Sequence, residues 1–424
     1  MIRFILKGIL RDRHRSVLPI IVTATGVMLT VVFHSWLTGV LDDSIEYNAR
    51  FSSGHVKILT PAYFNNIDQM PNDFAVIGTD KLLGELNERY SNMDWVERIH
   101  FAGLVDIPDK NGETVAQGPA LGFGIDMLSG QTEETARMNI PGALKEGSLP
   151  SKAGEVLLSE SFARKLGVSP GDPLTLIGST MYRELAIYNF VLSGTVEFGT
   201  KALDRGTIIA DISDVRLALN MEDAAGEILG FVRNEYFDEE ITGQVIADFN
   251  RDYYDEEDRF SSLMISLKDQ NNMGVFVDYS NKLLGLLLLI FVLAMSVILW
   301  NTGLLGGLRR YGEFGMRLAI GEDKNHVYRT MIYESIMISI IGSLAGVSLG
   351  LLISSYLQNH GIDLGIMMEN ATIMIPSVFR ARITTQTIYI GFIPGVLSTI
   401  IGAMLAGIGI YRRQTAKLIK ELQT

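Results

Sequence analysis

The residue types that most often perform catalysis are present in this chain, but they do not fall into a catalytic pattern. The six His residues are scattered, without the spacing of a metal site. Neither Ser159 nor Ser193 lies in a G-x-S-x-G elbow, and no Ser/His/Asp set can be proposed. The phosphate-binding pattern G-x-x-x-x-G-K-S/T does not occur. The sequence therefore predicts that the chain is not itself an enzyme, with no catalytic residue, metal site or cofactor of its own.

One run of acidic residues, DYYDEEDRF at 252–260, is a candidate cation site because clustered oxygen ligands suit Ca²⁺. The run lacks the spaced D-x-D-x-D-G pattern of a calcium loop. We therefore favour a solvated loop or the end of a helix at this position, and calcium binding is the alternative.

Composition divides the chain into an acidic part and a basic, apolar part. Residues 42–280 hold 40 acidic and 19 basic side chains, a net charge of −21, whereas the remainder holds 8 acidic and 17 basic ones, a net charge of +9. The hydrophobic share of 47% indicates a mixture of a soluble block and membrane segments. The acidic block argues against nucleic acid as a partner, since phosphates need a basic surface. The absence of Cys excludes disulfides and thiolate metal sites.

Four apolar stretches are long enough to cross a membrane as helices, which takes about 20 residues. They lie at residues 17–41, 283–308, 330–357 and 387–411. The third and fourth carry spaced small residues, namely Gly342, Gly346 and Gly350, and Gly391, Gly395 and Gly402. Such residues let helices pack closely in lipid, but Gly is also common in membrane helices, and the sequence leaves both interpretations open.

The Lys and Arg residues at the ends of these stretches predict the orientation, because basic residues gather on the cytoplasmic side. They cluster before the first stretch, between the second and third, and after the fourth: Arg3, Lys7, Arg11, Arg13 and Arg15; Arg309, Arg310, Arg317, Lys324 and Arg329; Arg412, Arg413, Lys417 and Lys420. Both termini, the loop 309–329 and the tail 412–424 are then cytoplasmic. Residues 42–280 and the loop 358–386 lie outside.

The first residues are expected to remain part of the protein. Residues 1–16 predict a cytoplasmic amphipathic helix on the membrane surface, with its apolar residues on one face. The following apolar run is too long for a cleaved signal peptide, and no A-x-A-like cleavage site follows it. An uncleaved anchor is therefore favoured.

The exported block alternates strand and helix patterns, which predicts an α+β domain. Residues 155–177 predict a strand, then a helix capped by Ser159, then a turn and a second strand. The apolar side of that helix bears Phe162, Ala163 and Leu166. A further helix is expected to be capped by Ser213 and to contain Val215, Leu217 and Leu219. The predicted fold is thus an all-α membrane part of four transmembrane helices, with an α+β domain inserted between helices 1 and 2.

The loop between the second and third spans contains a short amphipathic pattern. Its apolar residues are Leu308, Phe314, Leu318 and Ile320, and its charged residues are Arg309, Arg310, Glu313 and Arg317. A short helix with these two faces could dock into a soluble partner, or it could only stabilise the turn between two spans. The periodicity of the sequence does not decide between docking and stabilising the turn.

The segment RRYGEFGMRLAIGEDKNHVYRTMIYES, which begins at Arg309, resembles the signature of a superfamily of permeases that includes MacB, FtsX, LolC and LolE. That signature is R-x-x-E-I/F-G-x-x-R/K-A-I/L-G, followed by an apolar run with a Glu where the next span begins. The aligned positions are Arg310, Glu313, Phe314, Gly315, Leu318, Ala319, Ile320, Gly321 and Glu334, of which Leu318 stands where the signature has Arg or Lys. One span, a large exported domain and then three spans is also the layout of that superfamily.

The resemblance implies that this loop includes a coupling helix, which in the family sits in a groove of an ATPase subunit. The residues expected to couple to the ATPase are Arg309, Arg310, Glu313, Phe314, Gly315, Arg317, Leu318 and Gly321. Glu334 lies at the cytoplasmic edge of a span, where a carboxylate facing lipid is unfavourable, so it is expected to face protein or water. A structural role is favoured over proton transfer.

Three further segments resemble the lipoprotein-releasing LolC/LolE branch most closely. They are SSGHVKIL, GEVLLSESFARKLGVSPGDPLTLI and SGTVEFGTKALDRGTIIADISDVRLAL, which begin at residues 52, 154 and 193. The C-terminal tail departs from the P-A-x-x-A ending common in the family, which leaves its contact with the ATPase open.

The resemblance implies a mechanical transporter with several partners. A second copy of the permease or a paralogue pairs with this chain, and a dimer of ATPase subunits binds ATP and Mg. The implied client is a lipoprotein, passed from membrane lipid to a periplasmic carrier, for which Gly178–Asn189 is a candidate contact. A cleft between the first two spans is expected to be lined by Met28, Val31, Val32, Leu287, Phe291 and Met295, although contact with lipid or another helix is an equal alternative.

Two other functions fit the same superfamily. One is the efflux of drugs, peptides or toxins by a MacB-type exporter, and the other is FtsX-like signalling to a wall hydrolase. In each case the resemblance implies a multi-pass protein of the bacterial inner membrane with a periplasmic domain.

Overall fold

The computed structural model describes residues 13–109, 111–199, 201–233, 236–308, 311–363 and 378–412. Its contacts divide the chain into two compact units. The helical unit comprises Met1–Leu41, Tyr279–Asp363 and Val378–Thr424. The sheet unit comprises Asp42–Asp278 and Leu364–Ser377. The helix predicted over residues 1–16 and the tail 412–424 lie almost wholly outside the described residues.

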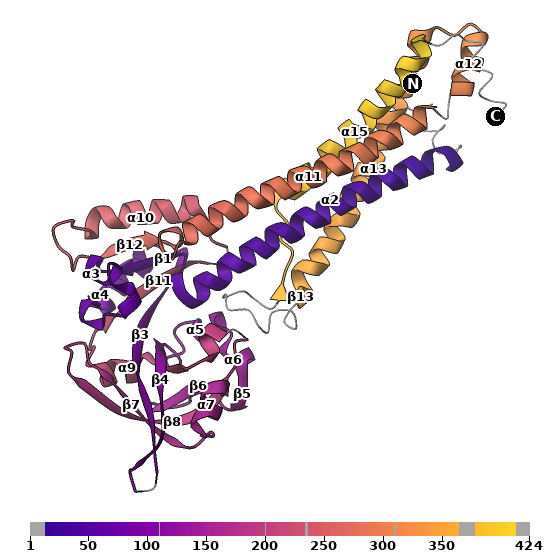
Figure 1. Cartoon of the computed structure of the whole chain (residues 1–424). Helices are drawn as coiled ribbons and strands as arrows, with labels where there is room; N and C mark the ends of the chain where they lie inside the picture. The colour runs from indigo at the N-terminus through magenta and orange to yellow at the C-terminus, as the bar shows by residue number, and fades with distance from the viewer. Residues whose placement is uncertain are drawn as a thin grey trace. The chain divides into compact units, whose positions relative to one another are not determined.

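Within the described residues, four helices of the helical unit are long and apolar enough to cross a membrane, and they run alongside one another (Figure 1). They are α2 (Arg13–Asn48), α11 (Met273–Leu308), α13 (Lys324–His360) and α15 (Thr385–Arg412). Each is longer than the stretch that hydropathy predicts, because polar turns extend it. The last turns of α2 carry Asp42, Asp43 and Glu46, which an apolar window excludes although a helix in water accepts them.

Glycines bring these helices into close contact. A Cβ atom added at Gly342, Gly346 or Gly350 of α13 would lie 2.8, 2.5 or 2.7 Å from an atom of α2. One added at Gly402 of α15 would lie 2.1 Å from the backbone oxygen of Trp300 in α11. The structure therefore favours the packing interpretation of the spaced small residues.

The helical unit also contains two short elements at the ends of its spans. The helix α12 (Tyr311–Ala319) lies between α11 and α13 in the sequence. The strands β13 (Ile362–Asp363) and β14 (Val378–Phe379) pair antiparallel beyond the end of α13, with Ile362 opposite Phe379.

The sheet unit is built on one ten-stranded sheet in the order β12-β1-β11-β3-β4-β9-β6-β8-β5, with β7 paired to both β3 and β8. The strands are β1 (Val56–Leu59), β3 (Met93–Pro108), β4 (Thr114–Ile125), β5 (Leu144–Gly147), β6 (Glu155–Ser159), β7 (Pro173–Ser179), β8 (Leu185–Val196), β9 (Thr207–Asp211), β11 (Glu227–Val232) and β12 (Leu263–Ser266). Because β7 joins β3 to β8, six strands (β3, β4, β9, β6, β8 and β7) form a closed ring.

The two largest hydrophobic cores of this unit each combine helices with strands. The helices α7 (Glu160–Leu166) and α9 (Ile212–Leu219) contribute Phe162 and Val215 to the core of the ring. The helices α4 (Thr79–Arg89) and α10 (Glu239–Tyr253) pack Leu86 and Phe249 onto the strands beyond β3, beside Trp95. Both cores combine helices and strands, so the unit is α+β in composition.

Details of two predictions change. The helix α7 buries Phe162, Ala163 and Leu166 as expected, but Ser159 makes no side-chain cap. Asp211, not Ser213, caps α9 and accepts the Ser213 amide at 3.0 Å, because β9 ends there. The helix contains Val215, Leu217 and Leu219 as expected, and Leu217 is exposed because it lies off the face formed by Val215, Ala218 and Leu219.

The acidic run at 252–260 forms the end of a helix and a loop. The helix α10 ends at Tyr253, and residues 254–260 are exposed. Among the described residues no group of three or more His, Cys, Asp or Glu side chains could hold a metal ion. The arrangement agrees with the solvated interpretation of this run.

Candidate functional site

The segment that carries the R-x-x-E-F-G motif folds as a short helix with one buried face. Tyr311 and Phe314 of α12 are buried and pack against Val327 and Met331 of α13. The Tyr311 hydroxyl donates a hydrogen bond to the backbone oxygen of Ala406 in α15, at 2.6 Å. α12 is therefore attached to two of the long helices.

The turn after α12 explains the glycine at the end of the motif. Gly321 has a φ of +103°, a left-handed conformation that an L side chain rarely adopts. The Glu322 amide donates to the Arg317 oxygen at 3.1 Å, which closes the end of α12. The Asp323 side chain then accepts the Asn325 amide and caps α13. The two helices are thus joined by a turn of fixed geometry.

The opposite face of α12 and its turn expose apolar side chains. Ile320 is 82% exposed and Met316 is 52% exposed, and Arg317 is exposed beside them. Exposed apolar groups around a cation form a surface suited to a protein groove. We call Met316, Arg317 and Ile320 the inner docking face.

The predicted coupling residues divide between these two faces. Phe314 and Gly315 are buried, Glu313 and Leu318 are half-buried, and Arg317 and Gly321 are exposed. Arg309 and Arg310 lie outside the described residues. Met316 is not among the predicted coupling residues, although helical phase places it on the exposed face. Tyr311, Phe314, Gly315 and Leu318 follow the spacing of one face, which leaves Met316 on the other.

Glu334 lies beside a small cavity within the helical unit. The cavity has a volume of about 50 Å³ and is lined by Pro19 of α2, Gly303 of α11, Glu334 and Ser335 of α13, and Thr399 of α15, among others. The Ser335 hydroxyl donates to the Thr399 oxygen at 3.3 Å. The half-buried Glu334 thus lies at a meeting point of the four helices.

The residues predicted to line a lipid cleft have different surroundings. Val31 is fully buried, and a Cβ added at Gly350 or Gly391 would lie 2.7 Å from it, so Val31 belongs to a contact of α2 with α13 and α15. Phe291 stacks on Phe33 with ring centroids 4.3 Å apart. Met28, Val32 and Met295 are half-buried, whereas Leu287 is exposed. Val31 therefore contacts other helices, which was the alternative to the predicted lipid cleft.

The sheet unit buries a cluster of ionisable groups that the sequence did not reveal. The Lys57 ammonium lies 2.5 Å from one carboxylate oxygen of Glu227, and His100 Nε2 lies 2.7 Å from the other. Burial alone acts to raise the pKa of Glu227, but Lys57 and His100 outweigh it and lower that pKa to about 2. Burial and the Glu227 charge raise the pKa of the neighbouring Tyr63. The cluster is enclosed, and it ties β1, β11 and β3 together.

Comparison with known proteins identifies part of the chain. Residues 285–415 match the family model FtsX-like permease C-terminal, which covers 131 of the 424 residues and includes α12, α13 and Glu334. The resemblance found through the R-x-x-E-F-G motif is thus confirmed for this part of the chain. The closer resemblance to the LolC/LolE branch stays a prediction.

The other two comparisons add little. The crystal structure of the periplasmic region of MacB from Actinobacillus actinomycetemcomitans is similar over 51% of this chain and 91% of that chain, with 14% identity and a TM-score of 0.33. No curated protein matches the chain.

Proposed function

We propose that this chain is the permease subunit of an ATP-driven ABC transporter of the bacterial inner membrane. The observation that carries the proposal is the inner docking face on α12, within the segment that matches the FtsX-like permease model. Both termini are cytoplasmic, and the sheet unit is periplasmic. ATP and Mg are bound by a partner dimer of ATPase subunits, and a second copy or a paralogue completes the permease.

In this mechanism the ATPase pushes on α12, and the chain passes the motion on. The buried contacts of Tyr311 and Phe314 make α12 move with α13 rather than swing freely. Close glycine contacts join α13 to α2, and α15 to α11, so the spans respond together. In this proposal ATP hydrolysis is carried out by the partner ATPase and not by this chain.

We further propose that the client is a lipoprotein, which the complex extracts from the membrane and passes to a periplasmic carrier. The support is the likeness of SSGHVKIL and the two longer segments to the lipoprotein-releasing branch. Each buried CH₂ of an acyl chain holds a lipoprotein in the bilayer by about 0.8 kcal/mol, so extraction needs an external energy source. Met28, Val32, Leu287, Phe291 and Met295 remain the candidate lipid contacts.

Association with the ATPase tests the permease assignment. Ile320→Asp or Met316→Asp in the full chain should reduce co-purification of the ATPase subunit about tenfold, because each places a carboxylate in an apolar contact. The matched control is Ile77→Asp, which makes the same change at an exposed residue of the sheet unit and should leave co-purification unchanged. Undiminished co-purification with both inner variants would contradict the assignment.

Depletion of the protein tests the client. Lipoproteins destined for the outer membrane should accumulate in the inner-membrane fraction. Correct sorting combined with raised sensitivity to toxic compounds would instead support MacB-type efflux. Correct sorting combined with impaired wall hydrolysis would support FtsX-like signalling.

A further inference from the structure

The end of α2 passes into the sheet through a buried π-helical turn, η1 (Ala49–Ser53). Ala49, Phe51 and Ser53 of this turn are buried. The chain then turns sharply at Gly54, where φ is +61° and an added Cβ would lie 2.6 Å from the backbone oxygen of Val56. Single π-helical turns often occur at functional positions. All the residues of this region belong to the sheet unit.

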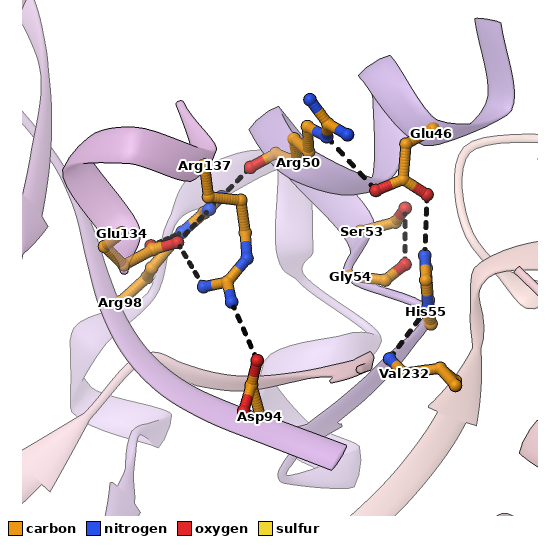
Figure 2. A network of polar contacts seen from close by, with 10 residues as sticks. All are labelled: Glu46, Arg50, Ser53, Gly54, His55, Asp94, Arg98, Glu134, Arg137 and Val232. Atoms are coloured by element: carbon orange, nitrogen blue, oxygen red, sulfur yellow. Dashed lines mark hydrogen bonds and ion pairs between the residues drawn. The ribbon is translucent and has the colours of Figure 1, made fainter. Parts of the chain in front are cut away.

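A buried arginine holds the backbone of η1 (Figure 2). The guanidinium of Arg98 on β3 is fully buried, and its Nη2 donates to the backbone oxygen of Arg50 at 2.5 Å. The same guanidinium donates to both carboxylate oxygens of Glu134, from Nε at 2.7 Å and from Nη2 at 3.1 Å. Glu134 is also fully buried and accepts from Arg137 at 3.2 Å. Burial alone acts to raise the pKa of Glu134, but Arg98 and Arg137 outweigh it, so its pKa is lowered.

A histidine holds the last turn of α2 from the other side (Figure 2). The Val232 amide donates to His55 Nδ1 at 3.0 Å, so the ring proton must lie on Nε2. His55 Nε2 then donates to Glu46 Oε2 at 2.8 Å. Glu46 therefore binds a ring whose tautomer is fixed by the sheet.

A third bond joins η1 to the start of α11. Gln270, also buried, donates from Nε2 to the Ser53 oxygen at 3.2 Å and to the Ser266 oxygen at 3.1 Å. The Met273 amide at the start of α11 donates to the Gln270 oxygen at 2.7 Å. Since β1 and β12 are paired neighbours, the two long helices connect to adjacent strands, and Gln270 links both connections.

This arrangement is not the simplest way to gain stability. A buried ion pair often adds little, and apolar residues of similar volume can replace it at no loss. Apolar packing is non-directional, however, whereas a charged hydrogen bond to a backbone oxygen fixes a helix end in position and direction. The bonds of Arg98, His55 and Gln270 all act on the helix end and the turn that follows it.

We infer that Arg98, Glu134 and Gln270 are positioning residues of a rigid joint, which fixes the last turn of α2 and the first turn of α11 on the sheet instead of leaving flexible linkers there. The inference rests on the proposed function, since it describes how ATP-driven motion becomes work on the client. The residues of the joint touch neither ATP nor client. They act through η1.

The test replaces the buried ion pair of Arg98 and Glu134 with apolar side chains of similar size. In the full chain, reconstituted with its ATPase in vesicles of bacterial phospholipid, R98M/E134M should leave ATP hydrolysis within about twofold of wild type and lower the lipoprotein released per ATP about tenfold. Amide hydrogen exchange in residues 49–53 should become about tenfold faster, as expected for the loss of a hydrogen bond to a charged group. The matched control is K57M/E227M, a buried pair that makes no hydrogen bond to η1 in the described part of the chain. It should alter neither readout.

The outcomes separate the joint from the proposed function. Unchanged exchange in η1, or faster exchange with normal release per ATP, would overturn the joint. A wild-type complex that hydrolyses ATP without releasing lipoprotein would overturn the proposed client and leave the exchange result standing. Should R98M/E134M fail to fold, Gln270→Leu removes the bond to the Ser53 oxygen of η1, together with the bond to Ser266, without leaving a charge unpaired, and is expected to reduce release per ATP in the same way.

Discussion

The helical unit and the sheet unit bury polar groups in different ways. Among the described residues, the buried polar side chains of the helical unit are all Ser, Thr or His, whereas the sheet unit buries Lys57, Arg98, Glu134 and Glu227. Several of the hydroxyls donate to the oxygen three or four residues earlier in their own helix, as Thr30 does to Gly26. Each of these four charges meets an opposite charge on another element.

The difference follows from the surroundings each unit must tolerate. In a bilayer an ionised side chain is unfavourable, so close steric fit at glycines and short hydroxyl bonds hold the helices. Outside the bilayer, paired charges can be buried within a sheet, and they give directional contacts that apolar side chains cannot. Removing a charge should therefore damage the sheet unit most, and adding volume should damage the helical unit most.

The largest effect is expected from Glu134→Ala. It leaves Arg98 buried without its carboxylate, which should lower the free energy of unfolding of the sheet unit by about 3–5 kcal/mol. Urea unfolding of the full chain in detergent measures this, with Trp36 and Trp300 replaced by Phe so that fluorescence reports the buried Trp95. A loss below about 1 kcal/mol, the range of exposed pairs, would show that this charge is not enclosed.

A smaller effect is expected from acid. Because the folded pKa of Glu227 lies below its usual value, its contribution to stability is present above about pH 4.5 and is lost as the pH falls towards 2. The shift corresponds to about 3 kcal/mol. Unfolding is followed through Trp95 fluorescence between pH 5 and pH 2. The wild-type protein should lose stability over this range, and K57M/E227M should not show this loss. Equal pH profiles for both proteins would contradict the role of this pair.

The smallest effect is expected from added volume in the helical unit. Gly346→Leu places atoms where a Cβ alone would lie 2.5 Å from the Ala24 oxygen, so overpacking should destabilise the unit by about 1–3 kcal/mol. Thermal unfolding in detergent, read from Trp36 and Trp300 with Trp95 replaced by Phe, checks the effect. Gly285→Leu, where an added Cβ meets nothing within 4 Å, is the control and should leave unfolding unchanged.

Sequence patterns were sufficient where structure depends on near neighbours. The four apolar stretches lie within α2, α11, α13 and α15, and the apolar side of α7 was identified correctly. The ends of the helices were not identified correctly, because Asp42 and Glu46 continue α2 beyond the apolar residues. Arg98 could not be singled out, because its acceptors lie 36 and 48 residues away in the sequence. Only the folded sheet brings them together.

The closed ring of six strands has a consequence for solubility. A free strand edge can pair with another chain and start aggregation, and a closed ring removes the edges of its own strands. The two ends of the full sheet order are β5 and β12, each only four residues long, and β5 carries Lys145 and Glu146. Both edges are short and one is charged, so neither offers a long apolar strand with which another chain could pair.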